Sequence, residues 1–200
     1  IFKRKFFYIL FCNRGKKSKF YGEINLLFSK NLKTWKQVKN FKIKPKKNSN
    51  ISSFTSPCFV KIKGVNFIYI QAQGSKFQSK IIRFRSYDFK NWIEDKSFLL
   101  ESKKFLFKSP YYTYLDPKYL YFSKENNYVK KICKINLKNF SETTVFKSKS
   151  SNEKFSVYSP TIFKENDQFI MIYAAWKNSK IGNLKVAISK DLKNWRKFNN

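Results

Sequence analysis

The stretch Ser189-Lys-Asp-Leu-Lys-Asn-Trp195 occurs in nearly the same form at two other places in the chain. The other copies are Ser29-Lys-Asn-Leu-Lys-Thr-Trp35 and Ser86-Tyr-Asp-Phe-Lys-Asn-Trp92. In each copy Ser and Trp are six residues apart, an apolar residue lies midway between them, and a Lys follows that residue. A motif that recurs three times in 200 residues indicates a repeated structural unit.

A Ser-Pro pair is the second repeated feature, and it occurs at Ser56-Pro57, Ser109-Pro110 and Ser159-Pro160. Each pair is predicted to open a strand, and Trp follows the first and the third Pro after 35 residues. Thirty residues after the middle Pro, Lys134-Ile-Asn-Leu-Lys-Asn-Phe140 is a degenerate copy of the Ser-to-Trp motif. The unit therefore recurs every 50 to 53 residues, measured from proline to proline.

Four short strands are predicted in each unit, and no helical period is present. In the last unit the strands are 161–164, 169–176, 184–189 and one that begins at Trp195. Residues 169–176 are continuously apolar, which indicates a strand buried on both faces. The middle units are expected to have strands at 58–63, 67–73, 80–86 and 92–98, and at 111–115, 119–122, 128–136 and 140–146. Four-stranded units at this spacing are typical of β-propeller blades.

The sequence therefore predicts an all-β chain, a β-propeller of four-stranded antiparallel blades in a single domain over residues 1–200. We expect a partial blade at residues 1–40 and full blades at about 51–99, 105–147 and 155–200. Five units of this length would need about 260 residues. The chain is therefore expected to be a fragment of a five-bladed parent.

These motifs resemble those of the five-bladed β-propeller glycosidases, the superfamily of glycosyl hydrolase families 43 and 32 with its arabinanases, xylosidases and invertases. The resemblance covers about residues 6–198 and includes Val186-Ala-Ile-Ser-Lys-Asp-Leu-Lys-Asn-Trp195. It implies a saccharide in the axial cavity and carboxylates at or next to the Pro of each inner strand. This chain has Ser56, Ser109 and Ser159 there, which puts hydrolysis in doubt, because glycosidases use two carboxyl groups about 5 to 9.5 Å apart.

Further candidate residues are expected around the same cavity. Glu101, Glu125 and Glu153 are predicted on loops at the cavity face, with Glu125 in the loop 123–127. Each is a candidate for a displaced catalytic acid, and a solvated surface Glu is the alternative. The candidate sugar-binding residues are the three serines and four aromatic side chains, which ordinary strand packing would explain equally well: Tyr111, Tyr112, Tyr158 and Trp176. Asp116-Pro117 aligns with the turns of other units and is predicted to be a turn tip.

Three functions remain open at this point. The chain is a glycoside hydrolase-like enzyme with residues partly outside this segment, a non-catalytic glycan-binding or accessory propeller, or a polyanion-binding protein. The net charge of +31 suggests the third, but the lysines are spread over the whole chain. Arg, which reads bases in nucleic-acid complexes, is scarce. We interpret the lysine-rich composition as a consequence of an AT-rich genome and expect carbohydrate, not a specific nucleic acid, as the partner.

The residue types that are missing exclude several classes of site. The chain has no His, which excludes Ser-His triads and the common zinc sites in this segment. Cys12, Cys58 and Cys133 are far apart and are expected to be reduced. No Gly-rich phosphate loop is present either. No cofactor and no metal are predicted. No apolar run is long enough to span a membrane, and no convincing signal peptide is seen, so a cytoplasmic location is expected.

Overall fold

A computed structural model of the chain describes residues 7–12, 22–47, 49–74, 78–127, 129–147, 156–178 and 180–198. These ranges contain fifteen β-strands and no helix, so the predicted all-β class is confirmed. It follows that, in these ranges, no apolar helix of membrane-spanning length occurs. The chain divides into two compact units, residues 1–101 and residues 102–200.

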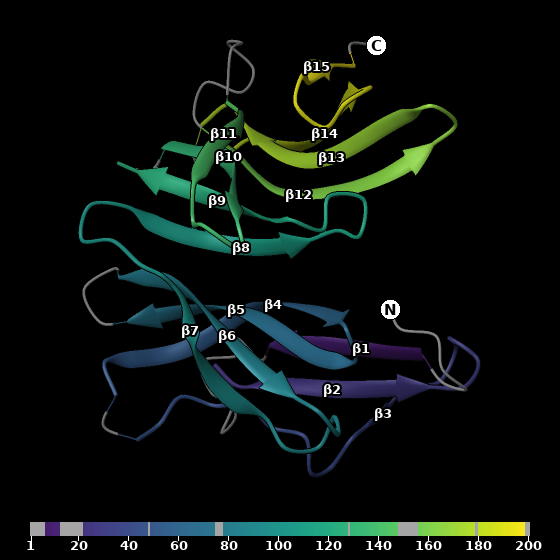
Figure 1. Cartoon of the computed structure of the whole chain (residues 1–200), viewed down its shortest axis with the longest axis vertical. Helices are drawn as coiled ribbons and strands as arrows, with labels where there is room; N and C mark the ends of the chain where they lie inside the picture. The colour runs from purple at the N-terminus through teal and green to yellow at the C-terminus, as the bar shows by residue number, and fades with distance from the viewer. Residues whose placement is uncertain are drawn as a thin grey trace. The chain divides into compact units, whose positions relative to one another are not determined.

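The first unit contains two antiparallel sheets in which each strand pairs with the next one along the chain (Figure 1). The three-stranded sheet consists of β1 (Phe7–Cys12), β2 (Ile24–Ser29) and β3 (Lys36–Gln37). The four-stranded sheet consists of β4 (Ile51–Ile62), β5 (Val65–Gly74), β6 (Ser79–Ser86) and β7 (Ile93–Leu100). A backbone hydrogen bond of 2.8 Å from Phe54 N to Gly22 O connects the two sheets.

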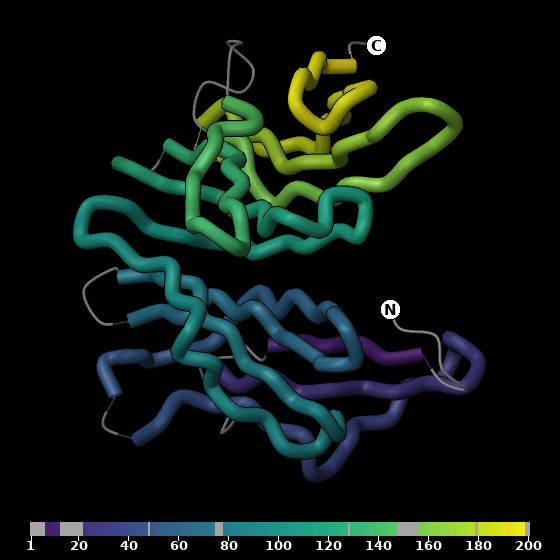
Figure 2. The backbone as a smooth tube through the Cα atoms, in the orientation of Figure 1, coloured from purple at the N-terminus to yellow at the C-terminus, as the bar shows by residue number. Residues whose placement is uncertain are grey.

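The second unit contains two four-stranded antiparallel meanders, whose path is followed most easily in the backbone trace (Figure 2). The first has β8 (Leu106–Tyr112), β9 (Tyr119–Asn126), β10 (Val129–Asn136) and β11 (Glu142–Phe146). The second has β12 (Ser156–Glu165), β13 (Gln168–Trp176), β14 (Gly182–Ser189) and β15 (Arg196–Lys197). A single parallel pair, Lys130 with Ser156, joins them. The four-stranded antiparallel blades predicted for this part of the sequence are therefore present as the two meanders.

The prediction that each Ser-Pro pair opens its strand is wrong. Strands β4, β8 and β12 begin before the pair, and each ladder shifts register where the pair lies. The φ angles are 49° at Ser56, 50° at Ser109 and 52° at Ser159, a region that residues other than Gly rarely adopt. An extra residue with such a φ is typical of a β-bulge, where the missing N–H of Pro breaks no ladder bond.

The core of the second unit is shared by its two meanders. Tyr121 and Ile132 of the first meander pack in one cluster with Met171 and Tyr173 of the second. These four side chains are at most 1% exposed. Because neither meander buries this surface alone, the two should fold as one body.

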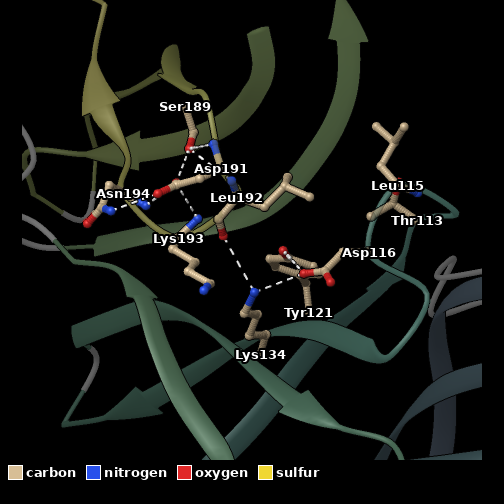
Figure 3. Close-up of polar contacts among 10 residues, drawn as sticks. All are labelled: Thr113, Leu115, Asp116, Tyr121, Lys134, Ser189, Asp191, Leu192, Lys193 and Asn194. Carbon is tan, nitrogen blue, oxygen red and sulfur yellow. Dashed lines mark hydrogen bonds and ion pairs between the residues drawn. The ribbon is translucent and has the colours of Figure 1, made fainter. Parts of the chain in front are cut away.

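The repeated Ser-to-Trp stretch is a turn that its own side chains stabilise (Figure 3). Ser189 Oγ accepts a hydrogen bond of 3.0 Å from the backbone N–H of Leu192. Asp191 Oδ1 accepts bonds of 2.9 and 2.8 Å from the N–H groups of Lys193 and Asn194. Leu192 has a φ of 60° and is 7% exposed, so the turn directs its apolar residue into the core.

The same bonds shift the acidity of the turn carboxyls. The backbone N–H of Asn194 lowers the pKa of Asp191 most, with further contributions from Lys193 and the Asn194 side chain. The pKa of Asp88 in the second copy is lowered in the same way, first by the backbone N–H of Asn91. In the first copy Asn31 takes the place of the aspartate and accepts two backbone bonds of 3.0 Å.

An ion pair with little exposure lies in the first meander of the second unit, and its lysine also reaches a turn of the second meander (Figure 3). The Lys134 ammonium lies 2.8 Å from Asp116 Oδ2 and donates to the carbonyl oxygen of Leu192 at 3.5 Å. The Tyr121 hydroxyl donates to the same Asp116 oxygen at 2.7 Å. Burial, and then the bond to Asp116, raise the pKa of Tyr121, so its phenol remains a donor. Asp116 and Pro117 lie in the turn between β8 and β9, as the alignment with other units predicts.

The double variant Asp88→Asn/Asp191→Asn should fold normally, because Asn31 makes the same bonds in the first copy. The folded-state pKa of both carboxyls lies below the ordinary value of 3.8. Their stabilising effect is therefore fully present above that pH and is lost as the pH falls below it. Urea unfolding at about pH 6 and about pH 3 should show a smaller acid-induced loss of stability in the variant. An acid-induced loss of stability as large in the variant as in the wild type would contradict the assignment of this effect to Asp88 and Asp191.

The variant Lys134→Met should lower the free energy of unfolding by about 3 kcal/mol, because it leaves the Asp116 carboxylate buried without its cation. The Lys134 and Asp116 side chains are only 9% and 15% exposed. Lys80→Met is the matched control, since it breaks an exposed pair with Glu101 and should change stability by less than about 1 kcal/mol. Equal losses in urea unfolding would show that the buried pair has no special role.

Candidate functional site

Two of the three Ser-Pro serines meet in the second unit. Ser159 Oγ donates a hydrogen bond of 3.1 Å to Ser109 Oγ. The backbone N–H of Ser159 donates to Ser123 Oγ, also at 3.1 Å, and Ser123 is fully buried. The bulges take both residues out of the regular ladder, so the two hydroxyls can meet between β8 and β12. This serine cluster (Ser109, Ser123 and Ser159) is the centre of the candidate site.

Ser56 occupies the corresponding bulge of β4 in the first unit. It is half-buried, and the hydroxyl oxygen of its neighbour Thr55 is buried without a hydrogen-bond partner among the described residues. Ser56 thus has the same backbone geometry as Ser109 and Ser159, but it belongs to the other unit.

Glu125 lies on strand β9 and not in a loop, which corrects the prediction of a loop at 123–127. It is 5% exposed, and its Oε2 accepts a hydrogen bond of 2.8 Å from Lys108. The Lys130 ammonium lies 3.6 Å from the same oxygen. The turn-like composition after Lys124 misled the prediction, because the strand runs on through Asn126 and pairs there with Val129.

An aromatic pair lies beside Glu125 and its two lysines. Trp176 Nε1 donates to the Tyr158 hydroxyl at 2.7 Å, and the two rings are stacked with centroids 6.5 Å apart. The Lys130 ammonium is 4.6 Å from the centroid of the Tyr158 ring. Gly182 pairs with Trp176 on the neighbouring strand, and a Cβ there would come within 2.6 Å of the indole. The absence of a side chain at Gly182 therefore lets the indole lie close against β14.

The other candidate residues have different surroundings. The Tyr111 hydroxyl donates to Ile162 O at 2.9 Å and accepts from Ile162 N at 3.0 Å, so it connects β8 to β12. The Tyr112 side chain is buried, and its hydroxyl donates to Pro117 O at 3.3 Å. Glu101 is exposed after β7, in the first unit, and forms an ion pair of 3.3 Å with Lys80. Glu153 lies outside the described residues.

The structure thus brings five of the candidates together, and it adds three residues that the sequence analysis missed. The five are Ser109, Ser159, Glu125, Tyr158 and Trp176. The three additions are Lys108, Ser123 and Lys130. One signal was available, because Ser123 and Glu125 are two apart and must share a face of their strand. The lysines gave no signal, since Lys is common throughout the chain.

The chemistry of the cluster suits binding more than bond cleavage. A serine hydroxyl becomes a nucleophile beside a general base, whereas the partner of Ser159 Oγ is another hydroxyl. Glycoside hydrolysis needs two carboxyl groups, and among the described residues the candidate site contains one, that of Glu125. No group of three or more His, Cys, Asp or Glu side chains that could hold a metal occurs in the described part of the chain. Hydroxyls, an aromatic face and fixed charges remain, which can bind a polyhydroxylated ligand.

The fold is shared with solved structures of family 43 glycoside hydrolases. A β-1,3-galactosidase of that family matches 100% of the chain with a TM-score of 0.72 and 18% identity. A thermostable family 43 glycoside hydrolase matches 99% of the chain (TM-score 0.70, 15% identity), and 70% of its own length is covered. A xylan β-1,4-xylosidase from Bacillus halodurans matches 97% (TM-score 0.65, 11% identity).

These matches confirm the predicted resemblance at the level of the fold. The chain spans 44% of the length of the galactosidase and 40% of that of the xylosidase. No protein-family model matches the sequence, and no curated protein matches it significantly.

The variant Gly182→Ala should displace the Trp176 indole, because the new methyl group would lie 2.6 Å from the ring. The overpacking should lower stability by about 1 kcal/mol. The near-ultraviolet circular dichroism spectrum should differ from that of the wild type in the same way as the spectrum of Trp176→Phe does. Asn183→Ala, at the next and exposed position, is the control and should leave the spectrum unchanged. A wild-type spectrum for Gly182→Ala would show that the indole does not depend on this glycine.

Proposed function

We propose that this chain is a saccharide-binding β-propeller with a glycosidase-like fold, in which serines occupy positions that carboxylates occupy in the glycosidases it resembles. The observation that carries the proposal is the hydrogen bond of 3.1 Å between the hydroxyls of Ser159 and Ser109. A pair of hydroxyls at this point can hydrogen-bond to a sugar but supplies neither the acid nor the nucleophile of hydrolysis.

The aromatic pair supplies the apolar part of the site. Sugar rings present C–H groups on one face, and these pack well on an aromatic ring. The bond of 2.7 Å to Tyr158 fixes the orientation of the Trp176 indole before any ligand arrives. Such preorganisation lowers the entropy lost on binding. Sugar hydroxyls would then contact Ser109, Ser159 and the charged group of Glu125 and its lysines. A few placed polar groups beside an apolar surface are typical of small-ligand sites.

Glu125 is the residue that would favour the alternative, a glycoside hydrolase. It is a buried carboxylate two residues from Ser123, on the same face of β9. A general acid must donate a proton to the leaving oxygen. The Glu125 oxygen Oε2 instead accepts a hydrogen bond from Lys108 and faces a second ammonium group. We therefore assign it a role in holding the two lysines, and we favour binding over hydrolysis.

Isothermal titration calorimetry with arabino-, xylo- and galacto-oligosaccharides tests the proposal. The wild-type chain should bind at least one of them. Trp176→Ala should weaken that binding about tenfold, since loss of an aromatic contact of about 1.4 kcal/mol corresponds to that factor. Tyr114→Ala is the control, because Tyr114 is a 66% exposed aromatic residue of the same unit outside the cluster, and binding should be unchanged.

Two outcomes would overturn the proposal. If no oligosaccharide binds, the site does not have this function. If the wild-type chain cleaves aryl glycosides and Glu125→Gln abolishes the cleavage, the chain is an enzyme and Glu125 is part of its machinery. Absence of cleavage together with Trp176-dependent binding is the expected result.

A further inference from the structure

A concave site lies in the second unit, between the last strands of its two meanders. This basic groove has a volume of about 670 Å³, within the range of about 300 to 1,000 Å³ found for ligand pockets. Four cationic residues line it, namely Lys131, Lys147, Arg196 and Lys197, and no acidic residue is among the described residues of its lining. Lys131 directly follows Lys130 in β10, so their side chains point to opposite faces of the sheet. The basic groove is therefore separate from the serine cluster.

The neighbouring acids are engaged elsewhere. Glu142 begins β11, and both of its oxygens accept hydrogen bonds from Lys124, at 2.8 and 2.9 Å. Asp191 accepts the backbone N–H groups of its own turn. Lys131 donates to the hydroxyl of Thr144, a neutral partner that also lines the groove. Among the described residues, no carboxylate in the lining cancels the positive charge of the groove.

The wall of the basic groove is apolar. Val145, Phe146 and Trp195 line it and pack against the core cluster of the unit. Trp195 Nε1 is buried without a hydrogen-bond partner among the described residues, so the carbon atoms of the indole are the part that lines the groove. A concave site with low-dielectric walls and charges of one sign concentrates its field on a ligand of opposite charge.

We propose that the basic groove binds a negatively charged polysaccharide, whose sulfate or carboxylate groups pair with the lysines and Arg196 while a sugar ring packs on the apolar wall. Nucleic acid fits the groove less well. Single-strand binding sites stack successive bases on several exposed aromatic rings, whereas Phe146 is only 7% exposed and Trp195 stands alone. Base reading also relies on Arg, and Arg196 is the one arginine among the described residues of the lining.

A charge-matched pair of triple variants tests this proposal. The groove variant is Lys131→Gln/Lys147→Gln/Arg196→Gln. The control variant is Lys118→Gln/Lys138→Gln/Lys164→Gln, which removes the same charge from exposed positions of the same unit. Fluorescence anisotropy with labelled dextran sulfate at about 0.15 M salt, where exposed charges are screened beyond about 8 Å, measures binding. Unsulfated dextran and a single-stranded DNA of similar charge are the comparison probes.

The groove variant should bind dextran sulfate at least tenfold more weakly than wild type, and the control variant less than threefold more weakly. Unsulfated dextran should not compete with dextran sulfate for the protein. The binding of DNA should be weakened equally in both variants. Equal loss of dextran sulfate binding in both variants would overturn the proposal, because net charge alone would then explain it. A loss of DNA binding confined to the groove variant, equal to or larger than that of dextran sulfate, would assign the groove to nucleic acid instead. Circular dichroism spectra of both variants establish that they are folded.

Discussion

Three serines with a left-handed backbone conformation interrupt the ladders of β4, β8 and β12. Ser56, Ser109 and Ser159 have φ angles between 49° and 52°, and each lies at a bulge that also contains a proline. A regular ladder has no place for proline, because its nitrogen cannot donate. The bulge accommodates the proline and at the same time turns the serine hydroxyl away from its register partners.

Several features of the second unit depend on this arrangement. The two displaced hydroxyls of Ser109 and Ser159 meet at 3.1 Å and link β8 to β12. Two residues further along β8, Tyr111 makes the second link, to both backbone groups of Ile162. The shared core and the hydrogen bond from Lys134 to the Leu192 carbonyl add contacts between the same two meanders. The candidate site is thus built on strands that four independent contacts hold together.

The scarcity of acids shapes the electrostatics of the protein. With 12 acidic against 43 basic residues, most lysines have no carboxylate available as a partner. Asp116, Glu125 and Glu142 of the second unit each bind a lysine at 2.8 Å. The surplus cations repel one another, and such self-repulsion destabilises a compact state. A polyanion bound at the basic groove would relieve part of that repulsion, whereas the neutral ligand proposed for the serine cluster would not.

The sequence alone determined the features that depend on neighbouring residues. The Ser-to-Trp turn could be recognised because Ser and Asp hydrogen-bond to backbone N–H groups within three residues of themselves. The four strands of each unit followed from local apolar patterns. Only the tertiary structure determined which residues come together in the candidate site. Ser109 and Ser159 are 50 residues apart, and Glu125 obtains its partners from β8 and β10. The bulges at the Ser-Pro pairs are also defined by the register of a partner strand. Such contacts depend on how strands are paired and packed, which no local pattern of residue types encodes.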